Sequence, residues 1–488
     1  MRCGAVWDAL KTKILNFKGV LNLKKSFRSV LPLTLMLLAL SPGVAGASQA
    51  PAIDTGDTAF VMISAALVLI MTPGLALFYG GMVRRKNVLS ILMQCFIIMC
   101  LVSVQWVLFG YSLSFGPDLG HIIGSLKWAG LNGVGQSPFP GYAATIPHQV
   151  FMLFQLMFAI ITVGLIIGSF AERMRFPAFL VFVLLWTTIV YDPLAHWVWG
   201  IGGWLRNMGA LDFAGGTVVH ISSGVSGLIA ALILGRRKGY GSEPILPHYL
   251  PMTVLGAALL WFGWFGFNAG SALAANGLAA SAFMVTNTAA AIAALSWVFA
   301  EWIHHGKPTV LGAASGGVAG LVAITPGSGY VGPMSALAIG LVAGIICYLA
   351  VSVMKVRFGY DDSLDVFGVH GVGGTWGALA TGLFASTAVN PAGANGLFYG
   401  NPAQLLIQLA GVAATWIFAA VLTTVILKAI SLATNLRVGA DDEEQGLDLS
   451  QHGEDGFADL VIGAPLMHSF SFTEDRAPVL RESSAGAK

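Results

Sequence analysis

Two histidines lie within long apolar segments of the sequence, where a charge is costly. His220 follows Asp212 by eight residues, and His370 follows Asp365 by five. Ionisable side chains at membrane depth tend to face the interior of a helix bundle or a polar pathway rather than lipid. A single buried histidine is most often a hydrogen-bonded core residue, whereas two in comparable segments favour a role in a pore.

Several aromatic residues could bind a cation at one end of such a pore. Phe154 and Phe158 are four residues apart and share a helix face, Phe267 and Ser271 have the same spacing, and Trp199 ends another apolar segment. Each ring alone is most simply a core or lipid-facing residue. Together they predict a cation site, because ring faces attract cations by up to about 2 kcal/mol and a hydroxyl accepts an N–H bond.

Asp212 permits two interpretations. Its carboxylate could bind a cation at the mouth of a pore. It also precedes a Gly-Gly-Thr sequence where an apolar helix begins, so it could cap that helix by accepting free backbone N–H groups. We favour the structural role, and the ligand role stays open.

The composition indicates an integral membrane protein. Of 488 residues, 56% are apolar and only 10% are charged, whereas soluble domains have about 25% charged residues. The net charge of +2 is too small to indicate a nucleic-acid partner. The four cysteines show no spacing typical of a zinc or haem site, so we expect no metal and no cofactor.

The amino-terminal region has the order of a secretory signal peptide. Basic residues up to Arg28 precede the apolar run Val30–Leu40, and Ala45-Gly46-Ala47 then offers a small-x-small cleavage site. An uncleaved first span is the alternative, but the run is shorter than the roughly 20 residues that cross a bilayer. We therefore expect a signal peptide over residues 1–47, a transmembrane domain over residues 48–436 and a cytoplasmic tail over residues 437–488.

Apolar runs of spanning length predict an all-α protein with about eleven transmembrane helices. Their expected cores are residues 58–82, 88–114, 149–170, 177–195, 214–235, 251–270, 279–303, 309–325, 334–356, 367–387 and 403–434.

Lysine and arginine residues concentrate in alternate connections between these spans, which predicts that those connections are cytoplasmic. The other connections contain only Lys127 and Arg206. The mature amino terminus is therefore predicted to be outside and the carboxyl terminus inside.

An odd number of spans divides into five plus five plus a long last helix. His220 falls in the fifth expected span and His370 in the tenth, 150 residues apart. Halves of five spans insert with opposite topology, and inverted repeats of this kind place a substrate site at their interface. Small-xxx-small spacings in the second half, such as Gly340/Gly344, indicate close helix packing.

Five motifs in this order resemble the ammonium transporter (Amt) family, and the resemblance covers Asp57–Glu454. They are Thr72–Gly81, Ile161–Gly168 with Ala171–Arg173, Asp212–His220, Gly263–Ser271 and Asp365–Gly371.

The resemblance implies a homotrimer in the bacterial inner (cytoplasmic) membrane, with one narrow pore in each protomer. By motif match, Trp199, Phe158 and Ser271 look like the outer ammonium site. Phe158 and Phe267, with Phe154 on the same helix face as Phe158, look like the gate below that site.

The same match gives expectations for the remaining polar residues. His220 and His370 look like the twin histidines of the pore, hydrogen-bonded to each other, and Asp212 like the acidic residue near the entrance.

The tail contains an acidic run, Asp441–Glu444, whose simplest interpretation is a solvated segment. The adjacent Gly446–Glu454 resembles the tail motif of the family, which packs on the inner face of the trimer. In bacterial members a PII-type regulatory protein docks there, so the resemblance implies such a partner.

The leading hypothesis is therefore transport of ammonium or ammonia, in the service of nitrogen utilisation. One alternative is an ammonium sensor that signals through its tail, and another is a channel for neutral gas or solute, which would not need the Trp199 site. An enzyme is the weakest hypothesis, because no nucleophile–base or metal-ligand set accompanies the histidines.

Overall fold

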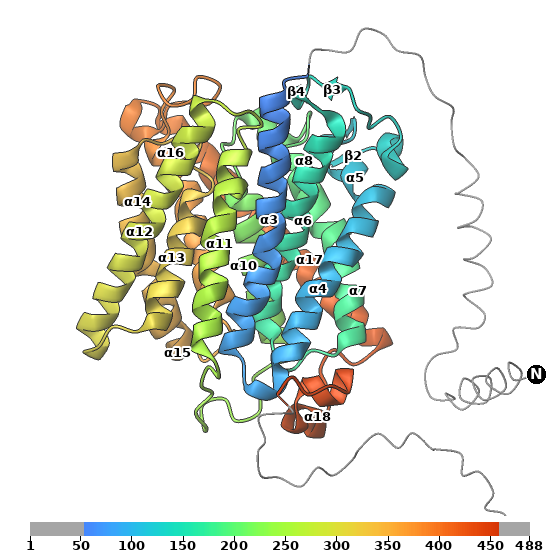
Figure 1. Ribbon diagram of the computed structural model, residues 1–488, viewed down its shortest axis with the longest axis vertical. Helices are drawn as coiled ribbons and strands as arrows, with labels where there is room; N and C mark the ends of the chain where they lie inside the picture. The colour runs from blue at the N-terminus through green and yellow to red at the C-terminus, as the bar shows by residue number, and fades with distance from the viewer. Residues whose placement is uncertain (1–52, 458–488) are drawn as a thin grey trace, which may run out of the picture. The chain divides into compact units, whose positions relative to one another are not determined.

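The computed structural model describes residues 53–457, which form a bundle of long helices (Figure 1). Within this range nine helices are long and apolar enough to cross a membrane. They are Thr55–Met82, Arg85–Phe115, His148–Phe170, Phe176–Val198, Gly216–Leu234, Leu250–Gly270, Gly277–His305, Pro333–Phe358 and Pro402–Ala433.

Five of the nine are single α-helices and four are built from several elements. The single ones are α3 (Thr55–Met82), α6 (His148–Phe170), α11 (Leu250–Gly270), α12 (Gly277–His305) and α17 (Pro402–Ala433). The composite ones are η1 (Arg85–Asn87) with α4 (Val88–Gln105), η2 (Trp106–Gly110) and α5 (Tyr111–Phe115); α7 (Phe176–Trp186) with η4 (Thr187–Tyr191) and α8 (Asp192–Val198); η5 (Gly216–Ile221) with α10 (Ser222–Leu234); and α14 (Pro333–Leu349) with η6 (Ala350–Met354) and α15 (Lys355–Phe358).

Two expected spans fall outside the nine. The run expected at 309–325 is the shorter apolar helix α13 (Val310–Ile324), and the run expected at 367–387 is η7 (Phe367–Gly371) followed by α16 (Val372–Phe384). For the nine helices, the expected ends differ from the observed ends by no more than three residues. The apolar pattern therefore located the helices well.

The two ends of the bundle differ in their connecting segments. The end that carries the strands is called the outer end, and the opposite end, with α18 (Ala440–Gln445) and the π-helical η9 (Asp448–His452), the inner end (Figure 1). Short helices complete the connections: η3 (Leu126–Leu131), α9 (Trp204–Met208) and η8 (Leu397–Tyr399).

Four short strands were not foreseen by the all-α expectation. β1 (Asp118–Leu119) pairs antiparallel with β2 (Ile123–Gly124), and β3 (Pro138–Phe139) with β4 (Ala143–Pro147). All four lie between α5 and α6, in a connection without an apolar run. Short ladders pair backbone groups there that helices do not.

The second half of the bundle packs closely through glycine. A Cβ atom at Gly340 would lie 2.3 Å from the carbonyl oxygen of Ala289, and one at Gly344 would lie 2.4 Å from that of Ala293. Helices α14 and α12 therefore touch backbone to backbone, as the small-xxx-small spacing predicts.

Candidate functional site

His220 and His370 meet at the centre of the bundle. Their Nδ1 atoms are 3.3 Å apart, and their rings are nearly parallel with centroids 5.3 Å apart. Both side chains are buried, with 1% and 4% of their surface exposed. The structure therefore brings the two imidazoles into the predicted contact. In this contact one Nδ1 must donate and the other accept.

The two histidines lie on corresponding π-helical segments, η5 and η7. Such segments are rare and often occur at functional sites. Helix α10, which follows η5, approaches η7 closely, because a Cβ atom at Gly224 would lie 2.1 Å from the backbone nitrogen of Gly371. Both segments must therefore have small residues, Gly224 and Gly371, where they approach each other, so that the imidazoles can meet.

Asp212 caps the first of these segments. Its Oδ1 accepts the N–H groups of Gly215 and Gly216 at 2.8 and 2.6 Å, and its Oδ2 accepts the N–H of Thr217 at 2.8 Å and the Thr217 hydroxyl. Burial raises the pKa of Asp212, and the hydrogen bonds from this turn oppose that rise. Because four donors occupy the carboxylate, the geometry favours the structural role over the ligand role.

The residue that corresponds to Asp212 in the second half is Asp362, not Asp365, the acid that the sequence motif pairs with His370. Asp362 precedes His370 by eight residues, and its Oδ2 accepts the N–H of Phe367 at 2.7 Å. Asp365 matches Gly215 instead, since both have positive φ, 63° and 116°. The sequence alone does not show that Asp362 corresponds to Asp212, because Asp365 is the acidic residue nearest to His370.

The predicted aromatic residues gather above the histidines. The Phe158 ring stacks on Phe267 with centroids 4.2 Å apart, and it meets Trp199 edge-on at 5.8 Å. Trp199 is held by its indole N–H, which donates to the carbonyl oxygen of Asp212 at 2.9 Å. Phe154 packs edge-on against Phe158 at 5.0 Å and is fully buried. Phe154 therefore supports the Phe158 ring from the side.

An outer cavity of about 560 Å³ opens onto this aromatic group. Phe158, Trp199 and Ser271 all line it. The Ser271 hydroxyl donates to the carbonyl oxygen of Phe267 at 2.9 Å, so its oxygen lone pairs remain able to accept a bond. The three residues expected to form a cation site thus share one cavity.

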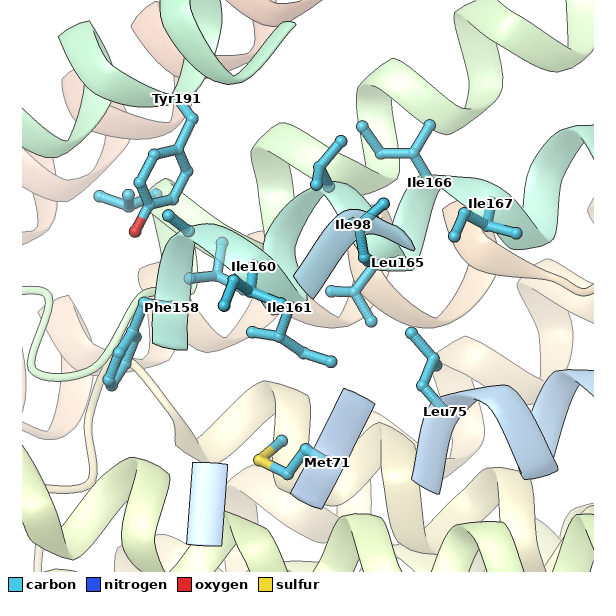
Figure 2. Close-up of a cluster of buried hydrophobic side chains, with 14 of the residues drawn as sticks. Met71, Leu75, Ile98, Phe158, Ile160, Ile161, Leu165, Ile166, Ile167 and Tyr191 are labelled. Carbon is cyan, nitrogen blue, oxygen red and sulfur yellow. The ribbon is translucent and has the colours of Figure 1, made fainter. Parts of the chain in front are cut away.

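Below Phe158 and Phe267 the free space shrinks to about 10 Å³, room for about one water molecule. Apolar side chains and the two histidines line this lumen. Figure 2 shows part of the wall, where Met71 and Leu75 of α3 face Ile161 and Leu165 of α6.

An inner cavity of about 210 Å³ begins on the other side of the histidines. His370 lines both the lumen and this cavity, and Glu301 and Asp365 add polar atoms to the inner wall. The described side chains thus form a sequence of cavities from the outer end to the inner end, narrowest at the histidines.

Trp264 is a lumen residue to which sequence reasoning gave no role. Its ring stacks on His220 with centroids 5.4 Å apart, and its N–H donates to the Thr325 hydroxyl at 2.8 Å. Its position three residues before Phe267 places both rings on one helix face, a spacing that could have identified it. No three His, Cys, Asp or Glu side chains in residues 53–457 gather as metal ligands would.

The tail packs on the inner end of the bundle as far as Phe457. Asp448 accepts the N–H groups of Leu89 and Ser90 at 3.0 and 2.7 Å and so caps α4. Glu443 binds the Arg437 guanidinium at 2.6 Å and is 2% exposed. Within the acidic run, Asp441 and Glu444 are exposed as a solvated segment predicts, whereas Glu443 is buried.

Comparison with known proteins gives consistent matches over the same range. Residues 59–457 match the family model described as Ammonium Transporter Family. The ammonium transporter of Bacillus subtilis is 56% identical over 407 residues, 83% of this chain and 99% of that protein, and ammonium transporter Amt1 of Archaeoglobus fulgidus is 48% identical over 399 residues, 82% and 98%. The crystal structure of Candida albicans Mep2 is 38% identical with a TM-score of 0.76, covering 83% of this chain and 91% of that one. A structure described as "Sensor Amt Protein" is 29% identical with a TM-score of 0.75, covering 81% and 98%.

Proposed function

The chain belongs to the ammonium transporter family, and we propose that it captures ammonium at the outer aromatic site, deprotonates it and passes it through the twin-histidine lumen. The family is one of transporters rather than enzymes. The multi-pass helical structure agrees with transport across a membrane.

The observation that carries this mechanism is the narrow apolar lumen between two wider cavities. A bare ammonium ion would not cross it readily, because moving a charge from water into a low-dielectric space costs far more than a single ring returns. Ammonia is neutral and of similar size. The lumen therefore suits a species that has lost its proton above it.

Capture is assigned to Trp199, Phe158 and Ser271. The two rings attract the cation, and the Ser271 hydroxyl accepts one of its N–H bonds. Phe158 and Phe267 form the gate beneath, with Phe154 supporting Phe158. Potassium has a similar radius but no N–H to donate, so this site favours ammonium.

His220 and His370 are assigned to proton transfer. Each imidazole has a donor and an acceptor nitrogen when neutral, so a hydrogen-bonded pair can pass a proton from one ring to the next. Ammonia and the proton would then cross separately. An ion that cannot lose a proton gains nothing from this route.

The wider architecture is proposed from the sequence pattern and the family. Eleven spans cross the inner (cytoplasmic) membrane as an inverted repeat of five plus five and a last helix, with the amino terminus outside and the carboxyl terminus inside. The transmembrane domain is residues 48–436, between a signal peptide cleaved near Ala47, which lies outside the described residues, and the tail 437–488. The protein is proposed to act as a homotrimer in nitrogen utilisation.

Electrical recording from purified protein in liposomes tests the mechanism. An ammonium gradient should produce a current, and a potassium gradient of equal size should not. A pH-sensitive dye inside the liposomes should report whether the proton accompanies the ammonia. Uptake of ammonia without current would replace the proposed deprotonation and proton transfer with a neutral-gas channel.

A PII-type protein is the proposed partner of the inner end. The segment Gly446–Glu454 supports this, because it is fixed against α4 rather than free. Truncation after Arg437 should lower transport and abolish co-purification with a PII-type protein. Full-strength binding by the truncated protein would put the docking surface elsewhere.

A sensor function is the second candidate, favoured by the likeness to the structure described as a sensor Amt protein. On that hypothesis occupancy of the outer site would change the contacts of the tail, and flux would be secondary. Hydrogen exchange of residues 437–457 with and without ammonium distinguishes the two. A change in exchange with little measurable flux would favour the sensor.

A further inference from the structure

Arg206 faces the space through which the cation must arrive, although its charge has the same sign as the substrate. Among the described residues that line the outer cavity, only Arg206 and Asp212 carry a formal charge. From sequence, Arg206 served only as one of two basic residues in the outer connections. We propose that Arg206 is a specificity residue of the outer cavity, which admits monovalent cations to the aromatic site and disfavours multivalent ones such as organic diammonium ions.

The charge of Asp212 partly offsets that of Arg206 in the cavity, but the two contributions add independently, so removing Arg206 still changes the potential felt by an arriving cation. The Asp212 carboxylate is 6% exposed, and four donors of the turn 215–217 occupy its oxygens. Its field still reaches the cavity wall: burial raises the pKa of Tyr330 most, Asp212 raises it further and Arg206 opposes that rise, so Asp212 and Arg206 act in opposite directions there. The Arg206 side chain is exposed, so its cation faces the solvent that fills the cavity.

The neighbouring hydroxyls add no negative charge of their own. Tyr142 and Tyr330 line the same cavity, and burial raises the pKa of each to about 12. Both phenols therefore stay neutral at physiological pH. The wall of the outer cavity thus combines neutral aromatic surface with one solvent-facing cation.

Arg206 is held where it acts. Its Nη1 donates to the carbonyl oxygen of Trp199, and its guanidinium lies 5.9 Å from the centre of the Tyr142 ring. Tyr142 is itself fixed, since its hydroxyl donates to Phe115 at 2.7 Å and accepts the N–H of Ile201 at 3.0 Å. The Arg206 charge therefore lies at the backbone carbonyl of Trp199, the residue whose ring would bind the cation.

Coulomb repulsion grows with the charge of the arriving ion, and this gives the selectivity. In a water-filled cavity, a unit charge within about 10 Å weakens occupancy by a monovalent cation about twofold and by a dication about fourfold. An ammonium ion loses little binding free energy to this repulsion, and its attraction to the π faces outweighs the loss. A diammonium ion loses the square of that factor and brings a second charge that the site cannot solvate.

The test compares Arg206→Gln, Arg206→Lys and Lys127→Gln in proteoliposomes, by uptake of radiolabelled methylammonium with 1,4-diaminobutane as competitor. Lys127 is the matched control, because it is the other outer basic residue, is exposed and does not line the cavity. At about 10 mM ionic strength, Arg206→Gln should lower the KM about twofold and the inhibition constant of the diamine about fourfold. At about 300 mM salt the ratios of the KM and of the inhibition constant between parent and Arg206→Gln should both approach one.

The remaining variants separate charge from support of Trp199. Arg206→Lys should retain the parental diamine inhibition, and Lys127→Gln should match the parent throughout. Equal inhibition of parent and Arg206→Gln at low salt would overturn the proposal. A loss of transport shared by Arg206→Gln and Arg206→Lys, without a change in diamine inhibition, would also overturn it and leave Arg206 as support for Trp199.

The inference rests on the proposed aromatic site, and its failure is distinguishable. If Trp199→Leu changes methylammonium uptake while Arg206→Gln does not change diamine inhibition, the aromatic site stands and only the charge selectivity is lost. If Trp199→Leu changes nothing, the site itself is lost, whatever Arg206→Gln does.

Discussion

The two segments that carry the histidines, η5 and η7, have similar backbone conformations but different surroundings. Each begins with an aspartate eight residues before its histidine and enters a π-helical turn. His220 then lies against the rings of Trp264 and Phe267, whereas His370 also lines the polar inner cavity. The shared turn therefore positions the pair, and the residues around it give the lumen its two different ends.

The carboxylates show the same contrast. Asp212 is fully used by the turn that it caps, while in the second half Asp362 receives the Phe367 N–H and Asp365 pairs with Lys355. The outer half thus engages its acid in a helix cap at the wall of the outer cavity, beside the aromatic surface. The inner half places Asp365 in the wall of the inner cavity, paired with Lys355.

The largest effect is expected from the histidines. His220→Ala or His370→Ala should stop the ammonium current or open a potassium leak, because in the proposed mechanism proton transfer along the pair excludes an ion that cannot deprotonate. His370→Ala should also destabilise more than His220→Ala, because it newly unpairs the Nδ1 of His220, at about 1 to 3 kcal/mol, and keeps the Nε2 of that ring, which already has no partner. Liposome currents and thermal stability in detergent measure both effects.

The control for this comparison is His305→Ala, a histidine exposed at the inner end outside the lumen. It should transport like the parent. Unchanged ammonium current with potassium still excluded in both lumen variants would show that the histidines only fill space.

The two capping aspartates should differ next. Asp212→Ala should lower the free energy of unfolding by about 3 kcal/mol, because several buried donors lose their acceptor together. Asp362→Ala removes one such bond and should cost about 1 kcal/mol. Thermal melting of both variants in the same detergent gives the difference, and equal melting temperatures would contradict the unequal use of the two carboxylates.

Trp199→Leu tests the aromatic end alone. Losing a desolvated cation–π contact of about 2 kcal/mol should raise the KM for ammonium tenfold or more and change its ratio to methylammonium. Trp204→Leu is the matched control, a tryptophan at the same end that does not line the cavity. Uptake indistinguishable from the parent across concentrations would remove the aromatic site.

Sequence reasoning reached the helices and most of the pore residues because their signals are local. Apolar runs located the spans, and the i, i+4 spacing joined Phe267 to Ser271. It did not find Asp362, since counting from the nearest acid to His370 gave Asp365, and only the backbone shows that Asp365 occupies the place of Gly215.

Contacts between distant segments were beyond the sequence pattern. The Asp448 cap on α4 joins residues more than 350 positions apart, as a long-range hydrogen bond that no periodicity reports. The sequence used Arg206 only to predict the side of a connection, whereas the structure places its charge in the wall of the outer cavity. Trp264 lay in a recognised motif, but its stacking on His220 depends on how two helices pack.

The smallest effect is expected at Ser271, and it refines the contrast between the two ends. The hydroxyl keeps its proton on the Phe267 carbonyl, so it offers the cation only an acceptor, and a neutral hydrogen bond contributes about 1 kcal/mol. Ser271→Ala should therefore raise the KM for ammonium about fivefold with little change in maximal rate, because the lumen and its histidines are untouched. Ser271→Thr keeps the acceptor and should stay within twofold of the parent. Methylammonium, with one N–H fewer to donate, should lose less than ammonium in Ser271→Ala. An equal loss for the two substrates would mean that Ser271 supports Phe267 through its own hydrogen bond and does not contact the ion.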